Sequence, residues 1–240
     1  MDLTSYLMGK QAGGGGGITP TGTINITENG TVDVTNYASA NVNVSGSQEY
    51  TIKAGSSNNS GFGYVLDQLP SITIDDTSCA YMFQDFFAKK IPVLKGTANV
   101  TNMNYMFRRC GLYADNIDTT ALSNFNTSNV TSMSNMFDSF KGKHLDLSSF
   151  NTSKVTTMAS MFQDTSYLAT LDISSFDLSS LTSFSNMFLR CGAYCKQADG
   201  AYAEKIPYVY VKDATMQNWV LTASNGHPNT WTTDNVVIKS

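Results

Sequence analysis

Pairs of methionine and phenylalanine recur along the middle of the chain and mark an internal repeat. Successive pairs are separated by 24, 30, 25 and 26 residues, the spacing of leucine-rich repeats. A repeat of this length cannot bury its apolar face alone, so neighbouring units must stack into a continuous core. The five pairs are Met82-Phe83, Met106-Phe107, Met136-Phe137, Met161-Phe162 and Met187-Phe188.

The clearest unit runs over residues 145–162 and aligns without a gap with residues 171–188. Its first part alternates, with Leu145 and Leu147 on either side of Asp146, which predicts a strand with one buried face. Five further segments match this strand: residues 72–74, 91–93, 117–119, 171–173 and 208–211.

The second part of the unit has another period. Val155, Met158, Met161 and Phe162 recur at i, i+3, i+6 and i+7, the apolar stripe of a short helix. Thr152 or Ser153 stands before the stripe and is suited to cap the first helical turn. Each unit is therefore predicted to contain a strand, a turn and a short helix.

These periods predict an α/β repeat solenoid, leucine-rich-repeat-like, with parallel strands and short helices. A small β-rich segment and a short N-terminal helix precede it. The expected divisions are a helix at 1–12, a polyglycine linker at 13–17, a β segment at 18–48, the repeats with an N-terminal cap at 49–205, and a C-terminal cap at 206–240. The two tryptophans, Trp219 and Trp231, fall in the last division.

The β segment at 18–48 alternates apolar and polar residues three times. Asn29-Gly30 separates the first two runs, and this dipeptide favours a tight turn between antiparallel strands. We therefore expect a hairpin here, in an element that is marginal alone and needs packing or oligomerisation.

Composition and charge argue against some classes of function. Hydrophobic residues make up 41% of the chain, which suits a folded protein, and charged residues only 14%. The net charge of −4 lacks the basic footprint that binds phosphates, so no nucleic-acid partner is expected. No apolar run reaches the roughly 18–20 residues of a membrane helix, so no membrane insertion is expected. Residues 1–5 do not resemble a secretory signal, which suggests that the chain stays inside the cell, leaves by another route or has lost its signal.

Catalytic and cofactor motifs are missing from the sequence, which predicts a protein that is not an enzyme and has no cofactor. His144 and His227 are the only imidazoles, and both are expected to be ordinary surface residues. Cys110 and Cys191 occupy equivalent repeat positions, which indicates small buried residues. Zinc needs about four well-spaced ligands, and Cys191 and Cys195 lack the usual close spacing, so no metal site is predicted.

One polar constellation could bind a ligand. Asp118, Asp146 and Asp172 occupy the same outward position of three predicted strands, with Ser148 and Ser174 alongside. Carboxylates stacked about 4.8 Å apart repel unless they are solvated, hydrogen-bonded or bridged by a cation. The first interpretation is a solvated ladder bonded to nearby Ser, Thr or backbone groups. Direct or calcium-assisted recognition of a ligand is the alternative.

The unit at 145–162 resembles the BspA-type leucine-rich repeats of bacterial surface proteins, which also occur as mycoplasma repeats of undefined function. The resemblance covers about residues 75–215. The first two units depart from it, because Thr97-Ala-Asn-Val100 replaces the Phe-Asn-Thr-Ser turn.

The amino-terminal part is similar to a different group. Residues 3–10 followed by glycines, and the β segment at 26–44, resemble the tail and baseplate proteins of phages and prophages of Gram-positive bacteria. This resemblance implies a virion component that attaches to the particle through its amino terminus.

The first expected function is therefore a tail-associated receptor-binding or adhesion protein located in the virion. Its expected partners are a host-surface glycan or protein, other tail or baseplate proteins, and further copies of itself, for instance in a trimer. The second is a bacterial cell-surface or secreted leucine-rich-repeat adhesin. An enzyme acting on wall glycans is the third class. Neighbouring genes for tails and lysis, or for export and anchoring, would separate the first two.

Overall fold

The computed structural model describes most of the repeat region and parts of both ends. The described residues are 23–26, 30–33, 41–44, 50–53, 71–74, 77–84, 90–91, 93–111, 117–192, 195–196, 202–203, 207–223 and 231–239. The predicted helix at 1–12, the polyglycine linker and His227 lie outside them.

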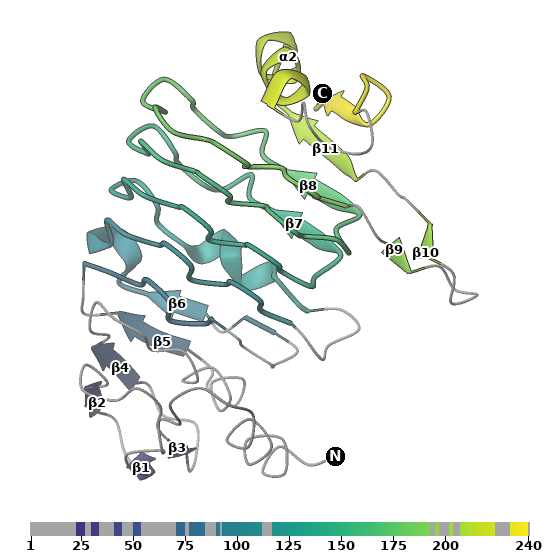
Figure 1. Ribbon diagram of the computed structural model, residues 1–240. Helices are drawn as coiled ribbons and strands as arrows, with labels where there is room; N and C mark the ends of the chain where they lie inside the picture. The colour runs from purple at the N-terminus through teal and green to yellow at the C-terminus, as the bar shows by residue number, and fades with distance from the viewer. Residues whose placement is uncertain are drawn as a thin grey trace.

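Parallel strands stack on one side of the molecule, and we call this side the strand ladder (Figure 1). One sheet contains, in spatial order, β2 (Gly30–Asp33), β4 (Tyr50–Lys53), β5 (Ser71–Ile74) and β6 (Val93–Lys95). A second contains β7 (His144–Asp146), β8 (Thr170–Asp172), β11 (Tyr208–Val211) and β12 (Val236–Ile238). Every neighbouring pair is parallel. Between the sheets, an isolated parallel bridge joins Lys90 to Asp118.

Most of the strands expected from alternation form, with two exceptions. Residues 117–119 make only the bridge at Asp118, and the chain then enters the 3₁₀ helix η3 (Thr120–Asn124). The strand expected at 91–93 begins two residues later, at Val93, and ends before η2 (Thr97–Asn99). Ile91 and Ile117 are nevertheless buried, as their apolar character requires.

Among the described residues, none of the apolar stripes that contain the Met-Phe pairs forms a helix, so the prediction of a short helix there is wrong; the 3₁₀ helices η2 and η3 lie elsewhere in the repeats. Instead, a second parallel column of isolated bridges connects successive coils, and we call it the bridge ladder. It joins Ser78, Asn102, Ser132, Thr157 and Ser183 in this order. After each bridge the chain makes tight turns with left-handed residues, for example Ser160 and Asp164, each with φ of 55°. An L-residue in this conformation cannot continue a right-handed helix.

Hydrogen bonds between coils replace those that a helix would make within itself. At every second residue the N–H donates to a carbonyl of the next coil, as Met158 N does to Ser183 O at 2.8 Å and Ser160 N to Ser185 O at 2.9 Å. The N–H groups in between close turns three residues back, as Met161 N does to Met158 O. Buried backbone groups are therefore paired, which a coil without regular helix must achieve to be stable.

The Met-Phe pairs all point inward, as predicted. All ten side chains are at most 1% exposed. The phenylalanine rings form a stacked column with centroid separations of 5.3 Å, 5.5 Å, 6.0 Å and 5.7 Å. Aromatic stacking and burial thus join each coil to the next through the core.

The equivalent cysteines Cys110 and Cys191 are also buried beside this column, which confirms their predicted structural role.

Thr152 and Ser153 do not cap a helix. Thr152 Oγ1 accepts a hydrogen bond from the Asp177 N–H of the next coil and donates to its carbonyl. Ser153 donates to Asn151 Oδ1 through both its N–H and its hydroxyl. Thr127 bonds Asn151 in the same way as Thr152 bonds Asp177. A buried threonine hydroxyl therefore connects adjacent coils at this corner.

The hairpin predicted around Asn29-Gly30 is also wrong. β1 (Thr23–Ile26) pairs in parallel with β3 (Asn41–Val44), and β2 pairs in parallel with β4. The first two strands therefore pair with later strands and not with each other. The sheet that contains β2 and β5 crosses the boundary expected between residues 48 and 49.

The C-terminal residues extend and cover the stack. After the short antiparallel strands β9 (Cys195–Lys196) and β10 (Tyr202–Ala203), β11 and β12 add two rungs to the strand ladder. The helix α2 (Ala214–Ala223) follows β11 at this end of the molecule (Figure 1). Trp219 and Trp231 both contact the ring of Phe188, at centroid distances of 6.3 Å and 5.2 Å. No helix among the described residues has the length and apolar character needed to cross a bilayer.

Candidate functional site

The structure brings together two of the three predicted aspartates. Asp146 of β7 and Asp172 of β8 are direct partners in parallel strands. Asp118 instead forms the isolated bridge to Lys90, and its neighbour Thr119 donates a hydrogen bond to the carbonyl of His144 at the start of β7. The regular ladder of carboxylates therefore has two adjacent members, with Asp118 outside the strand pairing.

Each aspartate of this pair is held by the serine two residues later. Asp146 Oδ1 accepts hydrogen bonds from the Ser148 N–H at 3.0 Å and its hydroxyl at 2.6 Å. Asp172 Oδ1 accepts the same two bonds from Ser174 at 3.0 Å and 2.6 Å. Asp118 similarly accepts from the Thr120 N–H at 2.9 Å. These are Asx turns, in which the side chain fixes the backbone as the strand ends.

Lys239, which the sequence analysis did not select, neutralises part of this face. Its ammonium group forms an ion pair with Asp172 Oδ2, and Asp172 is only 8% exposed. Burial raises the pKa of Asp172, but the hydrogen bonds from Lys239 and Ser174 and the lysine charge outweigh it, and the pKa lies below its ordinary value. The same hydrogen bond raises the pKa of Lys239. No sequence pattern indicated this contact, because the two residues are 67 positions apart.

An exposed carboxylate, that of Asp146, also lies on this face. The hydrogen bonds of the Asp146 Asx turn use Oδ1. His144 lies on the same strand, and its Nδ1 is 2.7 Å from the hydroxyl of Thr170. Within the described ranges, no three His, Cys, Asp or Glu side chains are grouped closely enough to hold a metal ion. The chemistry available here is hydrogen bonding and negative charge.

The bridge ladder carries a second polar face that the helix prediction concealed. Side chains on either side of the buried Met103, Met133 and Met158 point outward, in the pairs Asn102 and Asn104, Ser132 and Ser134, and Thr157 and Ala159; in the last coil Ser183 and Ser185 flank Phe184, which is exposed. They connect the coils: the Ser132 hydroxyl donates to Asn104 Oδ1 at 2.5 Å, and the Ser134 and Thr157 hydroxyls lie 2.9 Å apart. Their alternation with period two was the signal that could have predicted a strand-like segment.

Aromatic and threonine side chains border this second face. The rings of Tyr81 and Tyr105 are stacked at 4.7 Å with 4° between their planes, and the guanidinium of Arg108 lies 5.6 Å from the Tyr105 centroid. A column of exposed threonines runs beside the bridges, in which each hydroxyl donates to the carbonyl of the threonine one coil earlier. Its members are Thr77, Thr101, Thr131, Thr156 and Thr182.

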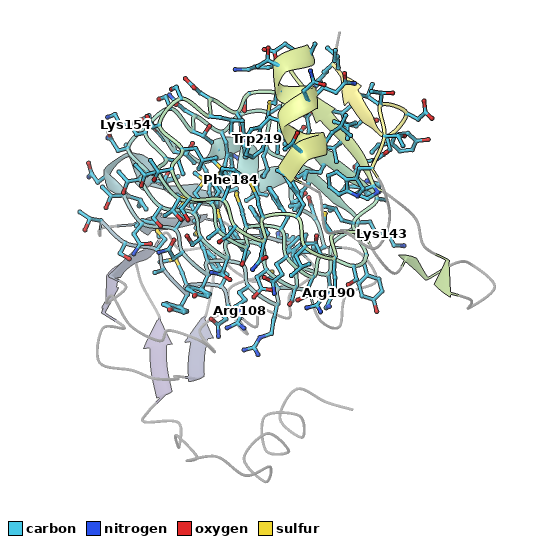
Figure 2. All side chains as sticks on the ribbon, turned by 45° about the horizontal axis from the view of Figure 1, so that its top comes forward. Arg108, Lys143, Lys154, Phe184, Arg190 and Trp219 are labelled. Atoms are coloured by element: carbon cyan, nitrogen blue, oxygen red, sulfur yellow. The ribbon has the colours of Figure 1, made fainter. Side chains whose placement is uncertain are left out.

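Charged side chains are paired along the edge where the turns end. Arg108 donates to Asp138 at 2.8 Å, and Arg190 donates to both oxygens of Asp164. Figure 2 shows both arginines along one edge of the molecule. Burial raises the pKa of Asp164, but hydrogen bonds from Arg190 and Gln163 and the nearby cations outweigh it and leave the pKa below its ordinary value. These ion pairs join neighbouring coils, so we assign them to stability.

Parallel pairing at repeat spacing on two sides, a common core and recurring outward polar groups define a protein of stacked repeats. The chain belongs to the family described as "Mycoplasma protein of unknown function, DUF285", whose model matches residues 77–202. This range contains the whole bridge ladder, from Ser78 to Ser183. Neither the curated proteins nor the solved structures contain a match to the chain.

Proposed function

We propose that the chain is a leucine-rich-repeat-like solenoid that acts as a non-enzymatic binding module of a phage or prophage tail. Its repeat faces bind a ligand on the host surface, either a glycan or a protein, and its amino terminus attaches to the particle. The observation that supports binding most directly is the parallel register of Asp146 with Asp172, each carrying a serine in the same geometry. A ligand with its own repeat can make the same hydrogen bonds to successive rungs.

The test of this face keeps the Asx turns and removes the charge. In the double variant Asp146→Asn and Asp172→Asn, the side-chain carbonyl still accepts from Ser148 and Ser174, so the local backbone is retained. We expect binding of the labelled full chain to cells of the host bacterium, or to their purified wall glycans, to weaken about tenfold or more, equivalent to about 1.4 kcal/mol.

Asp177→Asn is the matched control, because Asp177 Oδ1 accepts from the Ser179 N–H in the same kind of turn at another corner. Melting curves of all variants are measured in parallel. Undiminished binding by a folded double variant would contradict the assignment to this face, and the bridge-ladder face would then be the next to test.

The attachment role is tested by removing residues 1–17. Five consecutive glycines transmit little structure, so the shortened chain is expected to melt like the full chain while losing incorporation into particles. Early melting or aggregation of the shortened chain would show that the amino terminus belongs to the folded core.

A bacterial cell-surface or secreted leucine-rich-repeat adhesin is the second candidate function, because the repeats resemble those of bacterial surface proteins and the matching family is described from mycoplasmas. Neighbouring genes distinguish the two candidates. Tail and lysis genes would favour the virion, and export and anchoring genes would favour the cell surface.

A further inference from the structure

The bridge ladder ends at an exposed edge in its last coil. The last bridge joins Thr157 to Ser183, and all five residues from Thr182 to Asn186 are exposed. Their equivalents one coil earlier are partly or fully covered, apart from the corner threonine. The strand ladder, by contrast, continues past the same level, because β8 pairs with β11 and β11 with β12.

This edge presents two unused backbone donors, Phe184 N and Asn186 N, and one open backbone acceptor, the carbonyl of Thr182, on which no donor lies in the described residues. The carbonyls of Ser183 and Ser185 accept from the coil below, and those of Phe184 and Asn186 accept from Met187 and Leu189. The N–H groups of Phe184 and Asn186 correspond to those of Met158 and Ser160, which donate to the next coil. In the part of the chain that the structure describes, no acceptor lies on either of these two N–H groups.

The apolar column of the repeat is also interrupted here. Four residues occupy the position of Phe184 in the lower coils, and each is 0% exposed: Cys79, Met103, Met133 and Met158. Phe184 is 40% exposed, although its ring is larger. It lies beside Trp219 of α2, with 5.2 Å between ring centroids (Figure 2). The C-terminal helix thus covers one side of Phe184 and leaves the other open.

We propose that this edge, residues 182–186 with Phe184 at its centre, docks an extended segment of a partner polypeptide. The segment is added in parallel, as the next coil would be, with its carbonyls accepting from Phe184 N and Asn186 N. One of its large apolar side chains packs on the Phe184 ring. At the four lower junctions of the bridge ladder, the equivalent N–H groups donate to the carbonyls of an extended segment in the next coil. Strand addition at exposed sheet edges satisfies backbone donors in the same way.

The chemistry of the edge argues against pairing with itself. The edge offers two N–H donors but one open carbonyl, that of Thr182, so a twofold contact between two copies leaves one donor of each copy without an acceptor, whereas an extended segment with regularly spaced carbonyls satisfies both donors. The five residues of the edge also include no charged side chain and no proline, which proteins commonly use to block strand addition. This docking site lies apart from Asp146 and Asp172, so it does not depend on the ligand-binding role proposed above.

Amide hydrogen exchange of the full chain provides the test, with a blocked peptide of residues 156–164 as the probe, because this sequence forms a coil in the stack. In the free protein, the N–H groups of Phe184 and Asn186 are expected to exchange rapidly and those of Met158 and Ser160 slowly. Saturating peptide is expected to slow the first two about tenfold or more and to change Trp219 fluorescence, whereas a scrambled peptide does neither.

Phe184→Ser is expected to weaken peptide binding about tenfold, through loss of apolar contact area. Tyr208→Ser is the matched control, because Tyr208 is an aromatic residue 47% exposed on the strand ladder. Absence of protection at several millimolar peptide, or equal binding by folded Phe184→Ser, would overturn the proposal. A concentration-dependent dimer that Phe184→Ser abolishes would overturn it too, since a second copy would then cover the edge.

Discussion

Thr152 and Asp177, 25 residues apart, are joined by a reciprocal pair of hydrogen bonds between adjacent coils. The Asp177 N–H donates to Thr152 Oγ1 at 2.7 Å, and the Thr152 hydroxyl donates to the Asp177 carbonyl at 2.9 Å. Thr152 is 0% exposed. One hydroxyl therefore satisfies a donor and an acceptor of the neighbouring backbone at a corner without strand pairing.

Thr152→Val should destabilise the protein. Valine fills the same space, but the Asp177 N–H and carbonyl lose their partner, and an unsatisfied buried polar group costs about 1–3 kcal/mol. Urea unfolding measures this loss. Thr131→Val is the matched control and is expected to cost less than about 0.5 kcal/mol. Thr131 is exposed, and the carbonyl of Thr101, to which its hydroxyl donates, already accepts from the Thr131 N–H. An equal loss of unfolding free energy in the two variants would contradict a stabilising role for the buried hydrogen bonds of Thr152.

Phe162→Ala should cost roughly 3–5 kcal/mol, because it leaves a cavity in the middle of the phenylalanine column. The ring is 0% exposed and stacks on Phe137 and Phe188. Phe184→Ala is expected to cost less than half as much, since that ring is partly in solvent at the end of the stack. A loss under about 1 kcal/mol for Phe162→Ala would mean that the core relaxes around the cavity.

Gly96→Ala should be among the most disruptive small substitutions. Gly96 has φ of 76°, and a Cβ atom there would lie 2.4 Å from the carbonyl oxygen of Ile74. An unfavourable left-handed conformation costs on the order of 1–3 kcal/mol, and the backbone contact adds to it. Gly111→Ala is the control: φ is 84°, but its nearest neighbours would be side chains at 3.6 Å. The thermal midpoint should fall further for Gly96→Ala, and the reverse order would contradict the close approach of Gly96 to β5.

The ion pair between Asp172 and Lys239 should make the free energy of unfolding depend on pH. The pKa of Asp172 is lowered on folding, so its contribution is present above the unfolded value near 3.8 and is lost as the pH falls through the folded value. The measurement is the free energy of unfolding of wild type, Asp172→Asn, Lys239→Met and the double variant at pH 7 and below pH 3. Lys239 is largely in solvent, so the coupling at pH 7 is expected to stay below about 1 kcal/mol.

If the coupling free energy between Asp172 and Lys239 persists below pH 3, where Asp172 is protonated, the ion pair is not the origin of that coupling. Asn at position 172 retains the acceptor for Ser174, so this comparison isolates the ion pair from the Asx turn.

Residue patterns alone identified the repeat, its period and its inward positions. Apolar side chains must leave water, so the Met-Phe pairs and the alternation around Asp146 placed the core and several strands correctly. Local spacing also determined the Asx turns, because Asp146 and Ser148 are two residues apart and meet regardless of the rest of the fold.

The backbone partners were decided only by the tertiary structure. The stripe at Val155, Met158, Met161 and Phe162 fits a helix and a turning coil equally, and the acceptors that favour the coil lie about 25 residues away in the next repeat. The same holds for β1 and β2, which pair with later strands instead of forming a hairpin. Lys239 reaches Asp172 only because β12 closes the stack beside β11. Sequence specifies which side chains are buried, but pairing across long separations depends on which coils the folded chain brings together.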